Sequence, residues 1–310
     1  MASLLVGGTA LSPVDVAAAL LHRQADPAIV TIVWQLRLPR VCIAGVVGAG
    51  LAISGAMLQG MLRNPLVDPY LTGVSAGAAV AVALAILAGV SAAFTPAIGF
   101  VAGIAAALAV AALARRGGGI DPTRLILAGV SLSALFSAIV ALAVIRAQSS
   151  NYAGEIVAWL AGTMAGRGWR DLAATAPYVA AGCALAAWSI PALNALRIGD
   201  VRARTVGVDV ERAQWGILAG ASLLAASSVV LAGMVGFIGL LVPHVARRFV
   251  GSDARAMLPA CALAGAGLCA LADAACRWIV APAELPIGVL LAFVGVPAFL
   301  YLYLRDRTAS

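Results

Sequence analysis

Residues 41–62 read VCIAGVVGAGLAISGAMLQGML, a run of twenty-two residues without a single charge. An α-helix of about 20 apolar residues crosses the hydrocarbon core of a bilayer, so this stretch predicts a membrane-spanning helix. Further apolar runs of similar length follow it along the chain. We predict spans at about 71–90, 95–114, 124–145, 172–196, 214–235, 257–279 and 286–304, with a shorter broken one near 237–249.

The composition of the whole chain supports a membrane protein. Of its 310 residues, 63% are hydrophobic and 11% are charged, whereas soluble domains contain about 45–50% and about 25%. Glycine is abundant at 33 residues, and small residues let helices approach closely in lipid. We therefore predict an all-α fold, a polytopic membrane helix bundle that forms one transmembrane domain over residues 1–310.

Arginine carries all of the positive side-chain charge. The formal net charge is +7, and the sequence contains no lysine. A P-loop needs a lysine to reach nucleotide phosphates, and Schiff-base chemistry needs one too, so both are excluded. The arginines lie in short loops between apolar runs. Because cytoplasmic loops are rich in basic residues, this distribution indicates membrane orientation rather than nucleic-acid binding, and it places the loop at 197–212 in the cytoplasm.

Metal ligands are scarce in this sequence. The five cysteines form no C-x-x-C pair and lie in or beside apolar stretches, and there are only two histidines. A zinc site usually takes four such ligands, and buried cysteines more often serve as small hydrophobic residues. We expect neither a metal site nor a cofactor in this chain.

A polar corner follows the first predicted span. Gln59 stands near the end of the apolar run, and the segment RNPLVDP at 63–69 comes soon after it. Asn-Pro and Asp-Pro start turns, and a proline keeps the residue before it out of a helix. The segment therefore predicts a corner of fixed shape between two spans.

The longest charged stretch, RIGDVRARTVGVDVER, covers residues 197–212. Asp200 can cap a short helix, and Gly207 can end it in the left-handed conformation. An ordered helix on the cytoplasmic face indicates a docking partner more than a plain solvated loop.

Two ionisable residues stand four positions apart in the predicted span 257–279. Asp273 and Arg277 lie on one face of that helix, and charged groups at membrane depth usually pair. We therefore expect a mutual ion pair, although Arg277 is close enough to the outer end to meet a partner.

The segment GVSAG at 73–77 matches the G-x-S-x-G pattern of hydrolases. That pattern requires a strand-to-helix turn, whereas these residues open a predicted membrane helix. The spacing of Gly73 and Gly77 also suits close packing of helices. An intramembrane serine hydrolase that uses Ser75 and His244 is therefore the less favoured interpretation.

Taken together, these segments resemble the permease family of ABC importers for vitamin B12, ferric siderophores and haem. The resemblance extends from Leu11 to Leu304. It depends on motifs in a fixed order, namely RLPR at 37–40, the Gln59 to Ala78 run, Gly199 to Gly207, Gly239 to Arg247, Leu271 to Arg277, and Glu284 to Gly288.

The resemblance implies about ten transmembrane helices per subunit. We count nine complete spans and expect a first helix that is missing or cut to Met1–Val6, so that residues 1–40 are a truncated or periplasmic region. The implied assembly contains a second copy of this chain, two cytoplasmic ATPase subunits that hold ATP and magnesium, and a periplasmic binding protein. The implied location is the bacterial inner membrane.

The resemblance also implies roles for individual residues. Three sets are expected. The coupling helix that contacts the ATPase comprises Gly199, Asp200, Arg202, Ala203, Arg204 and Gly207. Outer arginines that pair with glutamates of the binding protein are Arg37, Arg40 and Arg277. The translocation path or its gate includes Gln59, Asn64, Pro65 and Leu66.

The substrate implied by the resemblance is a bulky metal chelate. Haem or a ferric siderophore is favoured, with haem slightly ahead, because Arg146, Arg167 and Arg170 fall on the predicted outer side and could attract carboxylates. Cobalamin is the close alternative. A different class, the ion-gradient-driven secondary transporter, needs acidic or histidine relays at membrane depth, for which Asp273 is the one candidate.

Overall fold

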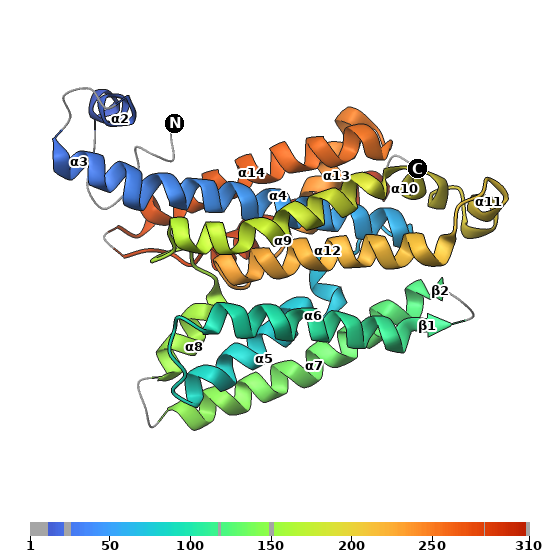
Figure 1. Cartoon of the computed structure of the whole chain (residues 1–310), viewed down its shortest axis with the longest axis horizontal. Helices are drawn as coiled ribbons and strands as arrows, with labels where there is room; N and C mark the ends of the chain where they lie inside the picture. Colours follow the sequence, from blue (N-terminus) through green and yellow to red (C-terminus); the bar gives the residue numbers. More distant parts are fainter. Residues whose placement is uncertain (1–11, 22–25, 117–118, 149–151, 282, 308–310) are drawn as a thin grey trace.

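The computed structural model describes residues 12–21, 26–116, 119–148, 152–281 and 283–307. The chain folds into a bundle whose long helices lie side by side along the longest axis of the molecule (Figure 1). The predicted all-α membrane bundle is confirmed. The truncated first helix expected at Met1–Val6 falls outside the described residues.

The N-terminal helices lead into the first predicted span. α2 (Pro13–Leu20) and α3 (Pro27–Thr31) begin with a proline in the first turn, and the side chains of Ser12 and Asp26 cap them. A π-helical stretch, η1 (Ile32–Arg37), continues α3 into α4 (Leu38–Leu62). The result is a helical run of 36 residues, so the helix begins before the predicted position 41.

α4 is the centre of one layer of the bundle. It packs against α12 (Val210–Ala232), α13 (Ile238–Val250) and α14 (Ala254–Ile279). Gly48 of α4 meets Gly265 of α14 so closely that a Cβ on either would overlap the backbone of the other. Small residues therefore set the distance between these two helices.

A second layer lies beside the first (Figure 1). The polar corner leads through a 3-10 turn, η2 (Pro69–Thr72), into α5 (Val74–Leu87), which packs against α6 (Thr95–Ala114) and α7 (Pro122–Ala147). The short α8 (Tyr152–Ala161), which no sequence pattern predicts, completes the layer.

The G-x-S-x-G segment is part of this second layer. Ser75 lies in the first turn of α5 and is buried, and the residues before it form a 3-10 turn rather than a strand. Gly77 faces Ala102 and Ala106 of α6, where a Cβ would overlap both residues. This geometry confirms the helix-packing interpretation and lacks the strand-to-helix turn of a nucleophile elbow.

The predicted span 172–196 is a bent pair of helices. α9 (Trp169–Trp188) and α10 (Ile190–Leu196) meet at Ser189 with a bend of 50°. Pro191, in the first turn of α10, has no amide hydrogen and cannot continue α9. The bend directs α10 towards the short helix α11 (Asp200–Thr205).

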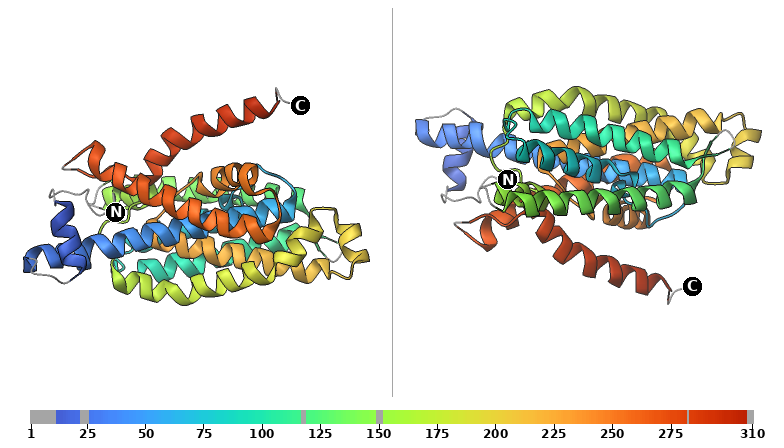
Figure 2. Two further views of the ribbon diagram at one scale, coloured as in Figure 1. Left: turned by 90° about the horizontal axis from the view of Figure 1, so that it is seen from above. Right: turned by 90° about the horizontal axis from the view of Figure 1, so that it is seen from below.

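The last helix leaves the bundle. α15 (Ile287–Arg307) packs at its N-terminal end, where Gly288 lies against the carbonyl groups of Ala161 and Met234. Its C-terminal end diverges from the other helices (Figure 2). Phe293 and Val294 are largely exposed in the single chain, so part of α15 presents an apolar surface.

Each of the nine predicted segments contains a helix, but the lengths differ. Among the described residues, five helices are long and apolar enough to span a membrane, and the bent pair α9–α10 makes six. The segments at 71–90 and 286–304 contain shorter apolar helices, Val74–Leu87 and Ile287–Tyr301, and the segment at 237–249 contains α13, which has 13 residues. Short or broken helices are common in transporters, where irregular backbone lines a path.

At one end of α6 the chain makes a small hairpin. β1 (Arg115–Arg116) pairs antiparallel with β2 (Gly119–Ile120). The hairpin and α11 lie at the same end of the molecule, and α2 and α3 lie at the opposite end (Figure 1). The loop at 197–212, predicted to be cytoplasmic, thus lies at the same end as Arg115 and Arg116 of the hairpin, and an arginine-rich end suits that orientation.

Candidate coupling site and candidate docking site

The predicted coupling segment is a short helix bounded by two glycines. Gly199 and Gly207 have φ angles of +106° and +86°, in a region that side chains disfavour. The amide of Gly207 donates to the carbonyl of Arg204, and the amide of Val208 donates to that of Ala203, each at 3.0 Å. These bonds close the C-terminus of α11, which confirms the predicted bounds of the helix.

α11 presents a mixed apolar and basic surface. Ala203 is buried and fixes the helix against the bundle, whereas Val201 is 78% exposed and Val206 is 66% exposed. Arg202 and Arg204 are exposed as well. Exposed apolar residues rimmed by charges are typical of a protein-binding surface.

Asp200 has a different role from the predicted one. Gly199 is the N-cap residue, and Asp200 is the first residue of α11. Its Oδ1 lies 3.1 Å from Nη2 of Arg63, the residue that ends α4 in the left-handed conformation. The carboxylate therefore joins α11 to α4 instead of capping its own helix.

A second connection runs through α10. The side-chain amide of Asn194 donates to Oδ1 of Asp253 at 2.7 Å, and its carbonyl accepts the amide of Ala254 at 2.9 Å. Arg197 donates to the carbonyl of Ser252. Hydrogen bonds from the Arg255 amide and from Asn194 lower the pKa of the Asp253 carboxyl, so the charged acceptor persists at neutral pH. The α10–α11 unit is thereby tied to the start of α14.

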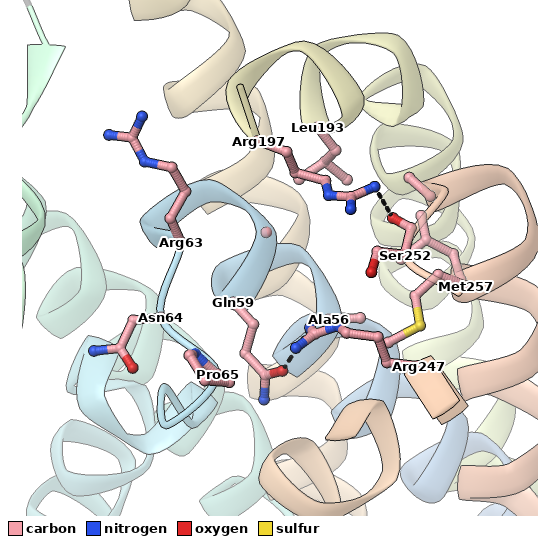
Figure 3. Close-up of a pocket in the computed structure, with 13 residues that line it drawn as sticks. Ala56, Gln59, Arg63, Asn64, Pro65, Leu193, Arg197, Arg247, Ser252 and Met257 are labelled. Carbon is pink, nitrogen blue, oxygen red and sulfur yellow. Dashed lines mark hydrogen bonds between the residues drawn. The ribbon is translucent and has the colours of Figure 1, made fainter. Parts of the chain in front are cut away.

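A cavity of about 250 Å³ opens beside these connections (Figure 3). Gln59, Asn64 and Pro65, three of the four predicted gate residues, line it together with Arg197 and Arg247. The fourth, Leu66, is 44% exposed and lines a separate cavity of about 590 Å³ between the polar corner, α8, α13 and α15.

Gln59 is a buried residue that lines the first cavity. Its side-chain nitrogen donates to the carbonyls of Val67 and Gly239, each at 3.2 Å, and its oxygen accepts from Nη2 of Arg247 at 3.2 Å (Figure 3). One amide thus joins α4, the polar corner and both ends of α13. The fixed shape expected of the corner has this network as its physical cause.

The second cavity borders an unusual backbone position. Phe237, the N-cap residue of α13, has a φ of +68°, which is rare for a bulky side chain. It lines the cavity with Asp68 and Tyr70, and its side chain fills the space beside Gly295 of α15. The unwound segment before α13 therefore contacts the helix that leaves the bundle.

At the opposite end, two of the three predicted docking arginines pair with two carboxylates, and the third, Arg37, lines the same outer cavity. Arg40 lies 3.0 Å from Asp273 and 2.9 Å from Glu284. Arg277 lies 3.1 Å from Asp273, which confirms the expected pairing within α14. Arg37 and Arg277 are each 6% exposed, so their docking role stays a prediction that requires this face to open.

The substrate-attracting arginines are only partly together. Arg167 pairs with Asp171 at 3.2 Å and lines an outer cavity of about 540 Å³ with Arg37, Arg40 and Arg277. Arg170 is exposed near the start of α9, and Arg146 lies on α7, in its last turn.

Several contacts of the two sites have no local signal in the sequence. The partners of Arg40, the Gln59–Arg247 bond and the Asn194–Asp253 bond all join segments that are far apart in the chain. Arg40 and Glu284 belong to separate motifs, and the order of these motifs in the sequence gives no sign that the two residues meet.

A bundle of apolar helices, several long enough to cross a membrane, with a short exposed helix at one end is the architecture of a multi-pass membrane protein. The chain belongs to the FecCD transport family, whose sequence model matches residues 1–305.

Known proteins of this family are similar over most of the chain. The cobalamin import system permease protein BtuC of Halobacterium salinarum is 41% identical over 89% of this chain and 74% of its own. The hemin transport system permease protein HmuU of Yersinia pestis is 38% identical over 89% of this chain and 84% of its own. A metal-chelate type ABC transporter solved in an inward-facing conformation is 33% identical, with a TM-score of 0.88 over 98% of this chain and 94% of that one. The chain is accordingly an ABC importer permease.

Proposed function

We propose that this chain is the permease subunit of a binding-protein-dependent importer in the bacterial inner membrane. It moves a metal chelate from a periplasmic binding protein into the cytoplasm, and ATP hydrolysis on a separate subunit drives the movement. The observation that carries this proposal is α11, a glycine-bounded helix with an exposed apolar and basic surface that is tied to α4 by the Arg63–Asp200 pair. The ATPase is the partner for that surface.

The contacts of α11 supply a path for movement. A displacement of α11 by the ATPase acts on the end of α4 through Arg63, and on the start of α14 through Asn194 of α10. α4 and α14 are in backbone contact at Gly48 and Gly265, so they move as one packed unit. Tilting of that unit relative to the second layer is the alternating-access step that we propose.

A second copy of the chain completes the path in this proposal. Only 17% of the most apolar stretch of α7 is buried in the single chain, and α15 exposes Phe293 and Val294. These faces suit burial against an identical subunit, because a two-fold axis would bring α15 of each copy towards the open side of the other. The 590 Å³ cavity beside α15 would then open towards the path between the subunits.

The substrate that we propose is an anionic metal chelate, with haem slightly ahead of a ferric siderophore. Four arginines line the outer cavity against one glutamate, and such an excess of positive charge attracts carboxylates. Cobalamin is the alternative, since relatives named for cobalamin and for hemin are similarly close. Uptake of haem, a ferric siderophore and cobalamin by the reconstituted importer distinguishes them, and uptake of cobalamin alone would refute the iron proposal.

The rival from another class, a secondary transporter, finds little support in Asp273. This carboxylate is buried and lies within 3.1 Å of both Arg40 and Arg277. Asp273 is therefore the centre of a structural ion-pair cluster, which is the ordinary reason for a charged residue at this depth.

The coupling role has a direct test in a purified importer complex. Gly207→Pro removes an amide that closes α11 and cannot adopt the observed φ. We expect this substitution to reduce ATP-driven uptake strongly while the ATPase subunit keeps its basal hydrolysis. Full transport and intact coupling in Gly207→Pro would refute the role of α11.

A further inference from the structure

Arg40 is held by two carboxylates of its own chain. Both of its terminal nitrogens donate to Glu284, Nη1 to Oε1 and Nη2 to Oε2 at 2.9 Å, and Nε donates to Oδ1 of Asp273 at 3.0 Å. Two parallel bonds from a guanidinium to a carboxylate form the strongest arrangement of this kind. Glu284 therefore makes with Arg40 the contact that an acidic residue of another protein would make.

The two carboxylates are not equivalent. Asp273 is 2% exposed at its side chain and also pairs with Arg277, whereas the side chain of Glu284 is 40% exposed. A buried carboxylate with two cationic partners is costly to separate from them. The pair with Glu284 is open to solvent on the carboxylate side, which weakens it relative to the buried pair with Asp273. Of the two carboxylates, Glu284 is therefore the one that another carboxylate can replace at Arg40.

The backbone that directly follows Glu284 is fixed by two hydrogen bonds. The amide of Leu285 donates to the carbonyl of Cys276, and the amide of Ile287 donates to the carbonyl of Gly162, each at 3.1 Å. The residues that follow Glu284 lead directly into α15. Exchange at Arg40 therefore needs only a change of the Glu284 side chain, and it occurs next to the helix that leaves the bundle.

The surroundings attract a further carboxylate. The outer cavity of about 540 Å³ is lined by Arg37, Arg40, Arg167 and Arg277, with Glu284 as its acidic residue. Even with Asp273 and Asp171 counted, cations exceed anions, four to three, in this cluster. An acidic loop approaching this end is drawn in by that excess.

We propose that Glu284 is an internal stand-in carboxylate, which occupies Arg40 in the undocked permease and gives way to an acidic side chain of the docking protein. This inference rests on the proposed function, in which a periplasmic binding protein delivers substrate at this end. Asp273 stays in place throughout, so Arg40 keeps one partner during the exchange. The measured docking affinity is then a difference between two ion pairs on the same guanidinium.

The exchange predicts that removing the charge of Glu284 strengthens docking. In the complete importer in lipid nanodiscs, the dissociation constant for the substrate-binding protein of the same import system is measured at low salt. We expect Glu284→Gln to tighten docking about two- to fivefold, the range of an exposed ion pair. Glu284→Asp, which keeps the charge but shortens the side chain, should give a smaller gain.

Two controls separate exchange from a general change in charge. Glu155→Gln removes an exposed acid of α8 that lines a neighbouring cavity with Arg167, and we expect it to leave docking within the error of the wild type. In an Arg40→Ala background, Glu284→Gln should have no effect on docking. The guanidinium for which Glu284 and the carboxylate of the docking protein compete is then absent.

The outcomes keep the two proposals apart. If the wild type docks but Glu284→Gln docks equally or more weakly, the exchange is refuted and the proposed function stands. A gain that Glu155→Gln reproduces, or that persists without Arg40, also refutes the exchange. If the wild type fails to bind the substrate-binding protein at all, the proposed function fails and the exchange fails with it.

Discussion

The guanidinium of Arg63 lies 3.1 Å from the carboxylate of Asp200, so the end of α4 and the first turn of α11 are joined by one ion pair. Both side chains are more than a third exposed, and such pairs contribute about 0–1 kcal/mol to stability. The contact matters as a mechanical connection, because it is the point at which a surface helix meets the helix at the centre of the bundle.

Reversing either charge of this pair should uncouple transport without unfolding the protein. We expect Arg63→Glu and Asp200→Arg each to reduce ATP-driven uptake severalfold in reconstituted vesicles, with a melting temperature close to that of the wild type. The double reversal restores the attraction and should recover much of the uptake.

An ion pair of similar geometry provides the control. Arg115 of β1 lies 3.0 Å from Glu211 of α12 at the same end of the molecule, and neither residue belongs to α11. Arg115→Glu should leave uptake near the wild-type level. A loss equal to that of Arg63→Glu, or a double reversal as poor as the single variants, would contradict the connecting role of Arg63 and Asp200.

A pair of glycines on α14 tests the packing against α4. A Cβ on Gly265 would overlap the carbonyl of Gly48, whereas a Cβ on Gly267 would meet nothing within 4 Å. We expect Gly265→Ala to destabilise the protein by about 1–3 kcal/mol, the usual cost of overpacking, and to lower its melting temperature in detergent. Gly267→Ala should be neutral or slightly stabilising, and equal effects of both substitutions would contradict the observed contact.

Gln59 allows a test of the buried polar network. Gln59→Leu keeps the size of the side chain but leaves the carbonyls of Val67 and Gly239 and the guanidinium of Arg247 with a lost partner. An unsatisfied buried polar group costs about 1–3 kcal/mol, so we expect a clear fall in thermal stability. Gln148→Leu, at the exposed end of α7, is the matched control, and a similar fall there would argue against the network.

The bounds of the coupling helix could be predicted because they depend on local chemistry. Gly199 and Gly207 have φ values that favour glycine. The presence of glycine at both positions can therefore be read from a single sequence as a sign of the helix ends. The role of Asp200 could not be predicted in the same way. The carboxylate of Asp200 could either cap its own helix or pair with the distant Arg63. Only the packing of α4 beside α11 decides between these two contacts.

The ion pairs of Arg40 at the outer end could not be predicted from the sequence either. Arg40 and Asp273 are 233 positions apart, and Arg40 and Glu284 are 244 apart. Their meeting depends on the close approach of α4 and α14, which Gly48 and Gly265 permit. The pairing of Asp273 with Arg277 was predictable, because four residues along one helix bring two side chains together.

Uptake of a haem chelate into vesicles, with the permease reconstituted alone or with its ATPase and binding protein, tests most directly whether the driving force comes from another subunit. We predict accumulation only in the complete assembly supplied with ATP and magnesium, and a severalfold fall in that accumulation when Asp200→Arg replaces the wild type. Accumulation by the permease alone, driven by an ion gradient and indifferent to ATP, would contradict the proposed mechanism.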